Sequence, residues 1–488
     1  MKKDVDLFSK ISPEEQRELE WGLLCVDPLD DKYRKSIAPL MSYISKAGEW
    51  KYCAQVQAAI MLGLEKFKKA TEKNVEEIDA AIEQIVPANI TLLENDVTKH
   101  DQLAVIAELS RYVSKDTARR IHPGTTSYDI LDTARNLAFK EAWFDVMRPE
   151  AVDNARALAK VARSEHLLDA VQVGRTHNQH TSPLYFKYML SCYAVNIANA
   201  IERIDLATED LEGKLAGITG SGASIAEFVG QNKQMDFEQH VIEDILELKL
   251  CTNPTQIIPK ANLILFGVNI LLLNGELANM ANTMRLLYSA EIGEVVSLPE
   301  KERLGGSSAD AGKNNPINWE NIAGQYEVAK GGLSTLFALQ VSDHQRDLRG
   351  SVQARYEPQR MMAMTYEALK RTRKAVKNLY VVKDKMKENL ETIRKKPTEA
   401  MTGIFKALLF EHPEYGDAHE SVKQWAKIAQ KEKMPLLDIA LQDSSFKTYW
   451  NEKLDDRQRE ILSGKIEEYA RSSIPRAHRN LKIVDKLD

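Results

Sequence analysis

Residues 262–290 read NLILFGVNILLLNGELANMANTMRLLYSA, a proline-free run with apolar side chains around much of the circumference of any helix it forms. A helix at the surface of a globular protein normally keeps one broad polar face. A helix this apolar is instead buried on several sides, so the run predicts the centre of a helical bundle or a helical interface between subunits. An oligomer is therefore expected.

The rest of the sequence also favours long helices. No proline lies between Pro183 and Pro254 or between Pro259 and Pro299, and an interior proline is what would break a helix. Apolar residues recur at steps of three, four or seven, which is the stripe of one bundle helix with charges on its other face: Leu190, Ile197, Ile201, Ile204, Leu211 and Leu215. The sequence predicts an all-α fold.

Turn signals rather than flexible linkers mark the expected domain boundaries. HPGTT at 122–126 and RYEPQ at 355–359 combine proline or glycine with polar residues and should interrupt the helices. We therefore expect three helical domains: an N-terminal domain (1–123), a central long-helix bundle that forms the oligomer core (124–358) and a C-terminal domain (359–488).

Composition and charge indicate which binding partners and which cellular compartment to expect. The net charge of -5 is small and both signs are interspersed, so no nucleic-acid surface is expected. The four cysteines form no CxxC pair, which favours a reducing cytoplasm over a disulfide framework or a zinc site. The N-terminus lacks the apolar core of a signal peptide, and the most apolar stretch, 263–273, is too short to cross a bilayer. We expect a cytoplasmic protein with no membrane partner, and no metal or organic cofactor.

Two stretches carry residues suited to proton transfer. GGSSADAGKNNPINWE at 305–320 is rich in glycine and small residues, which predicts a mobile loop with a helix beginning near Asn315-Pro316. VGRTHNQHTSP at 173–183 contains His177 and His180. A histidine is well suited to protonating a nitrogen leaving group near neutral pH, although a purely structural histidine remains the alternative.

Two further stretches are suited to binding anions. TKHDQLAV at 98–105 is followed by HPGTTSYDILDTA at 122–134, where hydroxyl groups and helix N-terminal amides either hold a carboxylate or merely cap the helix. QRDLRGSVQARY at 345–356 offers two arginines and a helix start near Gly350-Ser351, which suit a phosphate. The alternative is a solvated surface helix.

In their order along the chain, the four stretches resemble the motifs of the fumarase/aspartase superfamily, and 98–134 and 345–356 resemble those of adenylosuccinate lyases. The resemblance implies a homotetramer with active sites shared between subunits and small-molecule substrates. It also implies β-elimination of fumarate from adenylosuccinate to give AMP, and from SAICAR to give AICAR, in purine biosynthesis.

The resemblance also implies roles for individual residues. Ser307 would be the base and His177 the acid, Lys313 and Asn315 would bind the substrate carboxylate, and Glu320 would orient a histidine. A serine needs strong local stabilisation to act as a base, which Lys313 or loop amides would supply. The remaining substrate-binding residues would be Lys32, Tyr33, His100, Asp101, Thr126, Ser127, Gln256, Ser308, Arg346, Ser351 and Arg355.

The sequence departs from the family pattern at two places. Ala309-Asp310-Ala311 occupies the positions between the serines and Lys313 where the family usually has Met-Pro, and Asp310 adds a negative charge near an anionic substrate. Lys32 stands where the family has an arginine, which keeps the charge but loses the guanidinium fork. Two alternatives therefore stay open: a superfamily lyase with another leaving group, and an inactive helical scaffold.

Overall fold

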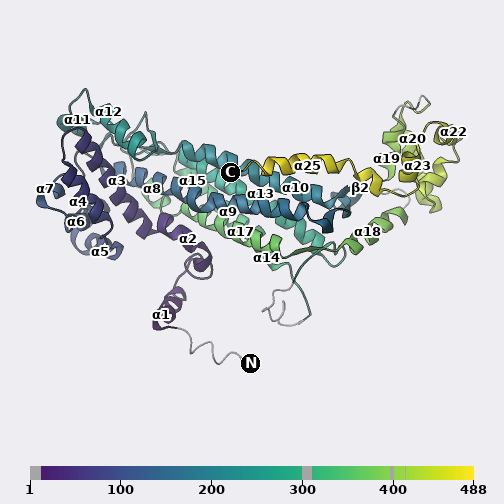
Figure 1. Cartoon of the computed structure of the whole chain (residues 1–488), viewed down its shortest axis with the longest axis horizontal. Helices are drawn as coiled ribbons and strands as arrows, with labels where there is room; N and C mark the ends of the chain where they lie inside the picture. Colours follow the sequence, from purple (N-terminus) through teal and green to yellow (C-terminus); the bar gives the residue numbers. More distant parts are fainter. Residues whose placement is uncertain are drawn as a thin grey trace. The chain divides into compact units, whose positions relative to one another are not determined.

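Helices account for most of the chain, and the few strands form three two-stranded sheets (Figure 1). The structure, a computed structural model, describes residues 12–298, 310, 312–395, 401–410, 412 and 414–487. The predicted all-α class is confirmed, although the short sheets were not predicted. The contacts divide the chain into two compact units, and the division into three domains stays a prediction. Unit 1 comprises 1–151, 200–275 and 324–370, and unit 2 comprises 152–199, 276–323 and 371–488.

Unit 1 carries the helices of the N-terminal third and the loops that pack on them. Its elements are α1 (Pro13–Gly22), α2 (Arg34–Ile44), α3 (Lys46–Lys66), α4 (Glu72–Ile82), α5 (Pro87–Leu93), η2 (Glu94–Thr98), α6 (Asp101–Ser110), α7 (Lys115–Ala118), α8 (Ser127–Ala142), η3 (Trp143–Met147), β3 (Glu212–Gly213), α11 (Ala223–Val229), α12 (Gln234–Gln239), η5 (His240–Ile245), β4 (Lys249–Leu250), α15 (Leu333–Ala338) and α16 (Arg349–Gln353).

Unit 2 carries two antiparallel two-stranded sheets, β1 with β2 and β5 with β6, and the C-terminal helices. Its elements are η4 (Glu165–Leu167), β1 (Val171–Thr176), β2 (Gln179–Tyr185), β5 (Val295–Ser297), β6 (Leu379–Val381), α18 (Lys383–Lys395), α19 (Met401–Leu408), α20 (Ala418–Glu432), α21 (Leu436–Ala440), α22 (Ser444–Glu452), α23 (Asp456–Leu462), α24 (Glu467–Ala470) and α25 (Ser473–Val484). Five further helices contribute residues to both units: α9 (Arg148–Ala162), α10 (Phe186–Glu209), α13 (Ala261–Tyr288), α14 (Ile317–Gly331) and α17 (Gln359–Lys377).

The apolar stripe from Leu190 to Leu215 extends beyond the end of the helix that it predicted. Its first four members are buried on α10 as expected, but α10 ends at Glu209. Leu211 and Leu215 are also buried, yet they lie beyond the helix. Glu212 and Gly213 pair instead with β4 as a parallel ladder, which takes this part of the chain out of the helical register. Apolar spacing alone does not show where such a change occurs.

The apolar run at 262–290 lies almost entirely in α13, a single helix of 28 residues. The prediction that the apolar stretch 263–273 is too short to cross a bilayer is wrong for the helix that contains it, because α13 has sufficient length and hydropathy. Burial identifies its role instead, since 61% of its most apolar 18-residue window is buried inside the chain. This burial is that of a core helix.

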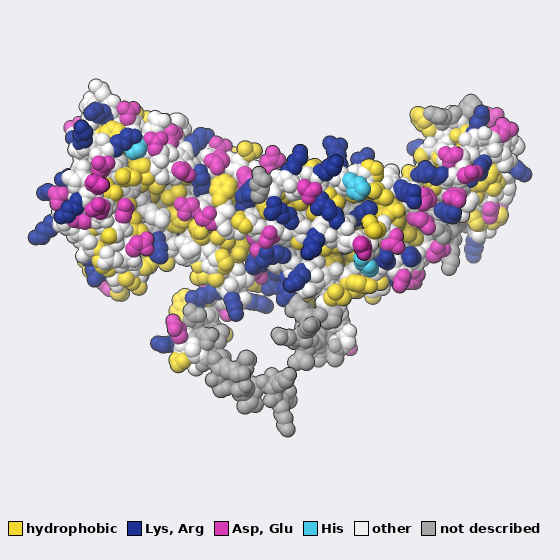
Figure 2. Space-filling view, in the orientation of Figure 1, with side chains coloured by type: hydrophobic (Ala, Val, Ile, Leu, Met, Phe, Trp, Pro, Cys, Tyr) yellow, Lys and Arg dark blue, Asp and Glu magenta, His cyan; other side chains and the backbone are white. Residues whose placement is uncertain are grey.

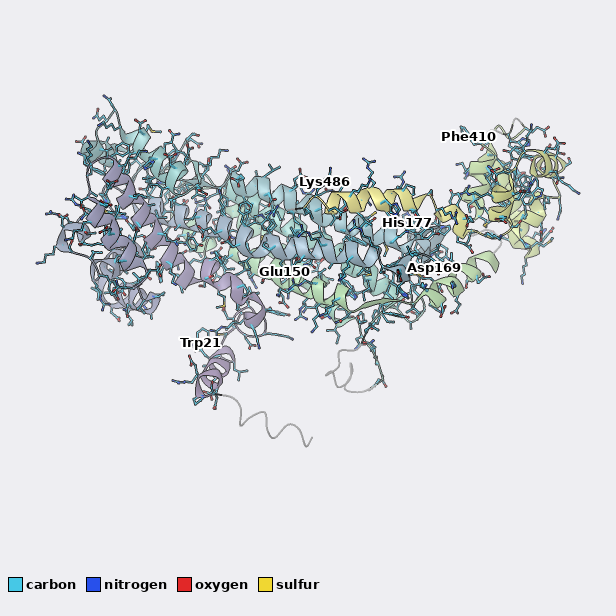
Figure 3. The ribbon with its side chains drawn as sticks, viewed as in Figure 1. Trp21, Glu150, Asp169, His177, Phe410 and Lys486 are labelled. Atoms are coloured by element: carbon cyan, nitrogen blue, oxygen red, sulfur yellow. The ribbon has the colours of Figure 1, made fainter. Side chains whose placement is uncertain are left out.

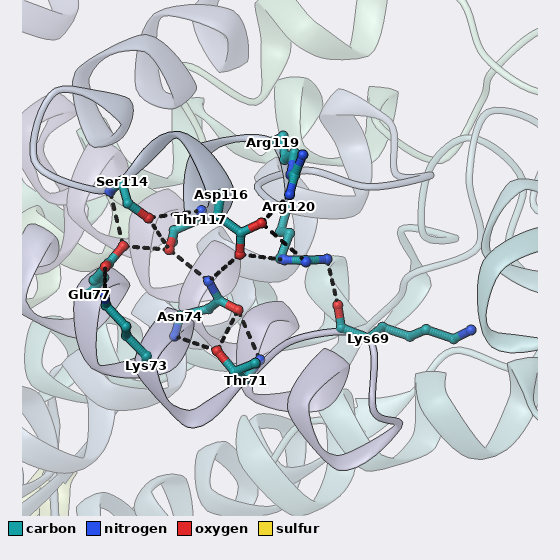
Figure 4. Close-up of polar contacts among 10 residues, drawn as sticks. All are labelled: Lys69, Thr71, Lys73, Asn74, Glu77, Ser114, Asp116, Thr117, Arg119 and Arg120. Atoms are coloured by element: carbon teal, nitrogen blue, oxygen red, sulfur yellow. Dashed lines mark hydrogen bonds and ion pairs between the residues drawn. The ribbon is translucent and has the colours of Figure 1, made fainter.

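A polar network ties α4 to α7 in unit 1 (Figure 4). The buried Asn74 donates to Asp116 Oδ2 at 3.1 Å and to Thr117 Oγ1 at 2.9 Å. Glu77 Oε2 accepts from the Ser114 amide at 2.9 Å and from the Thr117 hydroxyl at 2.5 Å. These bonds satisfy the polar groups of the short helix α7 and fix the chain shortly before the turn at His122.

The C-terminal helices of unit 2 have a core of their own. Phe446 is fully buried, with its ring centroid 5.7 Å from that of Phe405 and 5.3 Å from that of Trp425. Val171 and Val173 of β1 belong to the same cluster. On the outside, Figure 2 shows Lys and Arg side chains beside Asp and Glu side chains over the helices of both units.

Candidate functional site

The turn at residues 122–126 leads into α8 and is anchored at its start. His122 has a left-handed backbone (φ +63°), and the buried Gln57 of α3 holds it by two bonds. The His122 amide donates to Gln57 Oε1 at 3.1 Å, and Gln57 Nε2 lies 2.9 Å from His122 Nδ1. Burial lowers the pKa of His122, which favours a neutral structural ring.

Thr126 is the N-cap of α8, which is the capping role that the sequence offered as the alternative to binding a carboxylate. The Thr126 amide donates to Asp129 Oδ2 at 2.7 Å, so Asp129 closes the first turn of the helix. This leaves the half-buried Ser127 at the helix N-terminus, where the helix dipole favours a negative ligand.

Asp129 also binds the loop that follows β3. Its Oδ1 pairs with Lys214 Nζ and accepts from the Ala216 amide at 3.0 Å, while its Oδ2 accepts from the Gly217 amide at 3.1 Å. Both charged side chains are essentially excluded from solvent, with 0% of Asp129 and 1% of Lys214 exposed. The ion pair thus fixes the 214–217 segment against the start of α8. Sequence reasoning treated Asp129 only as a cap and missed Lys214.

The structure brings two predicted binding segments together at His100 and Ser127. His100 is the N-cap of α6, and its Nε2 lies 3.2 Å from Ser127 Oγ. Its Nδ1 lies 3.2 Å from Asp101 Oδ1, so the neighbouring carboxylate holds the ring in place. The His100 side chain is 44% exposed, which leaves it accessible to a ligand.

Arg346 joins this cluster from a distant part of the sequence. Its guanidinium carbon lies 3.7 Å from the centroid of the Tyr128 ring, in a cation–π contact. Its Nη1 donates to Gln256 Oε1 at 3.2 Å. Four predicted binding residues, His100, Ser127, Gln256 and Arg346, therefore lie in one chain of contacts that passes through Tyr128.

Arg355 has different surroundings. It lines a cavity of about 530 Å³ in unit 1, together with Asp27, Lys46 and Arg360. Ser351 is half-buried on α16, which begins at Arg349, one residue before the predicted start at Gly350. Arg346 contacts Gln256 and Tyr128, whereas Arg355 lines the cavity, and the convergence of Arg346, Ser351 and Arg355 on one anion stays a prediction.

Lys32 and Tyr33 precede α2. Tyr33 is the half-buried N-cap of this helix, and its amide donates to the Pro28 carbonyl at 2.9 Å. Lys32 is exposed. The nearby Asp27 lines the same cavity as Arg355. The structure thus brings the N-terminal segment to the cavity that Arg355 lines.

His177 occupies an unusual backbone position in unit 2 (Figure 3). It and Asn178 form the two-residue turn between β1 and β2, with φ values of +53° and +57°. Two positive φ values are typical of the tight turns that join antiparallel strands. The exposed His177 side chain therefore stands at the tip of a hairpin that the sequence analysis did not predict.

Arg175 anchors the His177 hairpin. Its guanidinium makes a two-pronged contact with the fully buried Glu294, with Nη2 at 2.7 Å from Oε1 and Nη1 at 3.1 Å from Oε2. Asn389 Nδ2 also donates to Glu294 Oε1 at 2.8 Å. Because bidentate arginine–carboxylate pairs fix geometry as well as charge, this contact orients the strand that carries His177.

The predicted catalytic loop is only partly within the described residues. Ser307 and Ser308 lie outside them. Lys313 and Glu320 are exposed, and Asn315 is half-buried directly before α14, which begins at Ile317 as predicted. The Lys313 amide donates to the Asp310 carbonyl at 3.0 Å. Within the described part of the chain, no group of three or more His, Cys, Asp or Glu side chains is arranged to hold a metal.

Glu238 gives unit 1 a pH-dependent stability. Burial raises the pKa of this carboxyl group to about 7, although Gln234 donates a hydrogen bond to it. The folded state therefore binds the proton more tightly than the unfolded state, and this contribution to stability is lost as the pH rises through about 7. Glu238→Gln should remove on the order of 3 kcal/mol of the fall in unfolding free energy between pH 5 and pH 8. Urea unfolding of the wild-type protein and of Glu238→Gln between pH 5 and pH 8 measures this difference. If the unfolding free energies of the two proteins fell equally with pH, the prediction would be contradicted.

The chain is similar in sequence to known lyases. A family model described as Lyase matches residues 33–331. The adenylosuccinate lyase of Archaeoglobus fulgidus is 26% identical over 469 residues, which cover 95% of this chain and 100% of the relative. The adenylosuccinate lyase of Pyrococcus abyssi is 31% identical over 378 residues, which cover 76% of this chain and 80% of the relative.

The fold also matches a solved structure. The fumarate lyase from Mesorhizobium sp. BNC1 superposes with a TM-score of 0.75 at 19% identity, covering 92% of this chain and 97% of that chain. At this identity, the similarity shows a shared fold.

Proposed function

This chain belongs to the adenylosuccinate lyase family and is a carbon–nitrogen lyase, and we propose that it splits adenylosuccinate into AMP and fumarate. We also propose the matching cleavage of SAICAR into AICAR and fumarate. Both are β-eliminations that break a C–N bond next to a succinyl carboxylate. Both substrates carry a phosphate and carboxylates, so the site needs several anion-binding groups.

The observation that carries the proposal is the chain of contacts from His100 through Ser127, Tyr128 and Arg346 to Gln256. Residues from four separate stretches of the sequence meet there. Arg346 supplies a guanidinium for a phosphate, and Ser127 supplies a helix N-terminus for a carboxylate. A phosphorylated succinyl substrate requires both.

The chemistry then follows from the proposed roles. Ser307 removes the proton from the carbon next to the carboxylate, and Lys313 with Asn315 stabilises the negative charge that spreads onto that carboxylate. His177 donates a proton to the departing nitrogen, and Glu320 orients a histidine. Thr126 and Ser308 complete the carboxylate site. Lys32, Tyr33, Ser351 and Arg355 assist Arg346 in binding the nucleotide.

We propose that the active protein is a homotetramer in which different subunits complete each site. The α13 helix supports this assembly, because Leu265 and Leu272 are 56% and 50% exposed although they are large apolar side chains. Their spacing of seven residues places them on one face.

The four free cysteines suit the reducing cytoplasm, where we expect the enzyme to work.

A panel of substrates tests the proposed reaction. We expect the purified protein to release fumarate from adenylosuccinate and from SAICAR, and to leave argininosuccinate and aspartate uncleaved. The absorbance of fumarate measures kcat/KM for each compound. Cleavage of argininosuccinate or aspartate, with adenylosuccinate left intact, would show that the leaving group is another amine.

A further inference from the structure

A second buried aspartate lies one helical turn beyond Asp129. Asp132 Oδ2 accepts from the Ile258 amide at 3.0 Å and lies 2.6 Å from Lys260 Nζ. The exposed fractions are 5% for the Asp132 side chain and 11% for that of Lys260. Because Asp132 binds both a backbone amide and a side chain of the same segment, it fixes the place of residues 258–260 relative to α8.

The segment that Asp132 fixes leads directly to Arg346. Gln256 lies two residues before Ile258 and accepts a hydrogen bond from Arg346 Nη1 at 3.2 Å. Arg346 also contacts the ring of Tyr128, which lies on α8 one turn before Asp132. Helix α8 therefore holds this guanidinium in two ways, directly through Tyr128 and indirectly through Asp132 and Gln256.

Asp132 is the group that stabilises the positive charge of Lys260 in its buried surroundings. Burial lowers the pKa of Lys260, and the cations Arg135 and Lys214 lower it further, whereas Asp132 opposes both effects. Arg135 is itself paired with Glu49 at 2.7 Å, and Lys214 is paired with Asp129. A buried ion pair stabilises a fold little compared with apolar side chains of the same volume, so its role here is better sought in geometry.

We propose that Asp132 and Lys260 are positioning residues that hold Gln256 and thereby place the Arg346 guanidinium for the phosphate of the substrate. The inference rests on the proposed function, in which Arg346 binds that phosphate. It assigns no contact with substrate to Asp132 or Lys260. Their effect should therefore be confined to ligands that carry a phosphate.

Binding of AMP and adenosine to the full-length protein tests this inference. Asp132→Asn removes the charge that holds Lys260, and the double variant Asp132→Asn with Lys260→Met removes both charges, so that no lone buried lysine remains. In both variants, we expect the Kd of AMP to rise about tenfold, which is the effect of displacing one hydrogen bond to a charged group. The Kd of adenosine should stay within about twofold of the wild-type value. Isothermal titration calorimetry measures both constants.

A second measurement separates positioning from general damage. Asp205 is a matched control, because it is a partly buried carboxylate of unit 1 that pairs with Arg148 and Trp143 away from Gln256. Asp205→Asn should leave the ratio of the AMP and adenosine constants unchanged. If Asp132 acts through Arg346, adding Asp132→Asn to Arg346→Ala should weaken AMP binding no further than Arg346→Ala alone.

The outcomes distinguish this inference from the proposed function. An unchanged AMP-to-adenosine ratio in both Asp132 variants would overturn the inference even if the wild-type protein cleaves adenylosuccinate. Additive losses in the Arg346→Ala background would also overturn it. A wild-type protein that prefers AMP to adenosine but releases no fumarate would contradict the proposed reaction, while the variants would still test the positioning of Arg346.

Discussion

Replacing His177 by alanine is expected to lower kcat for adenylosuccinate by a factor of about 10²–10⁴, the usual contribution of a general acid. His177 stands exposed at the tip of the β1–β2 hairpin, with its strand held by the Arg175–Glu294 pair. Loss of the imidazole removes the proton donor for the departing nitrogen but leaves the anion-binding residues in place. KM should therefore change much less than kcat, which steady-state kinetics with adenylosuccinate will show.

Two further variants separate the imidazole from the shape of the turn. His177→Asn should lose as much activity as the alanine variant, because asparagine tolerates a positive φ but cannot donate the proton. Asn178→Gly keeps both the turn and the imidazole, so its kcat should stay close to the wild-type value. Near-normal kcat in His177→Asn would assign the proton donor to another residue, His180 being the first to test.

Asp129→Asn is expected to lower the free energy of unfolding by about 3–5 kcal/mol, the usual penalty for breaking a buried ion pair. Lys214 would keep a buried charge without its partner. The new amide group would also face the backbone N–H donors of Thr126 or Gly217 in place of an acceptor oxygen. Such a loss is a large share of the stability of an ordinary folded protein, so urea denaturation should show an earlier midpoint.

Asp210→Asn provides the matched control for this stability effect. Asp210 pairs with Lys249 at 2.7 Å, but the two side chains are 57% and 50% exposed. Solvent screens an exposed pair, so its loss should move the midpoint little. Equal shifts for Asp129→Asn and Asp210→Asn would show that burial does not set the strength of the Asp129–Lys214 contact.

The fold was predictable where local patterns decide it. The continuous apolar surface of 262–290 predicted a buried helix, and α13 is one. The turn signals at 122–126 and the Asn315-Pro316 pair correctly marked the starts of α8 and α14. The end of α10 was not predictable, because Leu211 and Leu215 continue the apolar spacing and only the non-local pairing of β3 with β4 shows that the helix has stopped.

The sequence proposed residues for the candidate site but not their arrangement. Motifs proposed His100, Ser127, Gln256 and Arg346, whereas their contacts depend on groups far away in the sequence. Lys214 and Lys260 look like ordinary surface lysines in the sequence, and only the fold places them against Asp129 and Asp132. The turn at His177 was missed because it lacks the glycine that usually marks a tight hairpin.

The most direct measurement of the central claim is the product balance from adenylosuccinate. Purified protein should convert adenylosuccinate into AMP and fumarate in equal amounts, with both products quantified by chromatography as the substrate disappears. His177→Ala, assayed at the same concentration, should form both products far more slowly. Intact adenylosuccinate after prolonged incubation with the folded wild-type protein would contradict the proposed function.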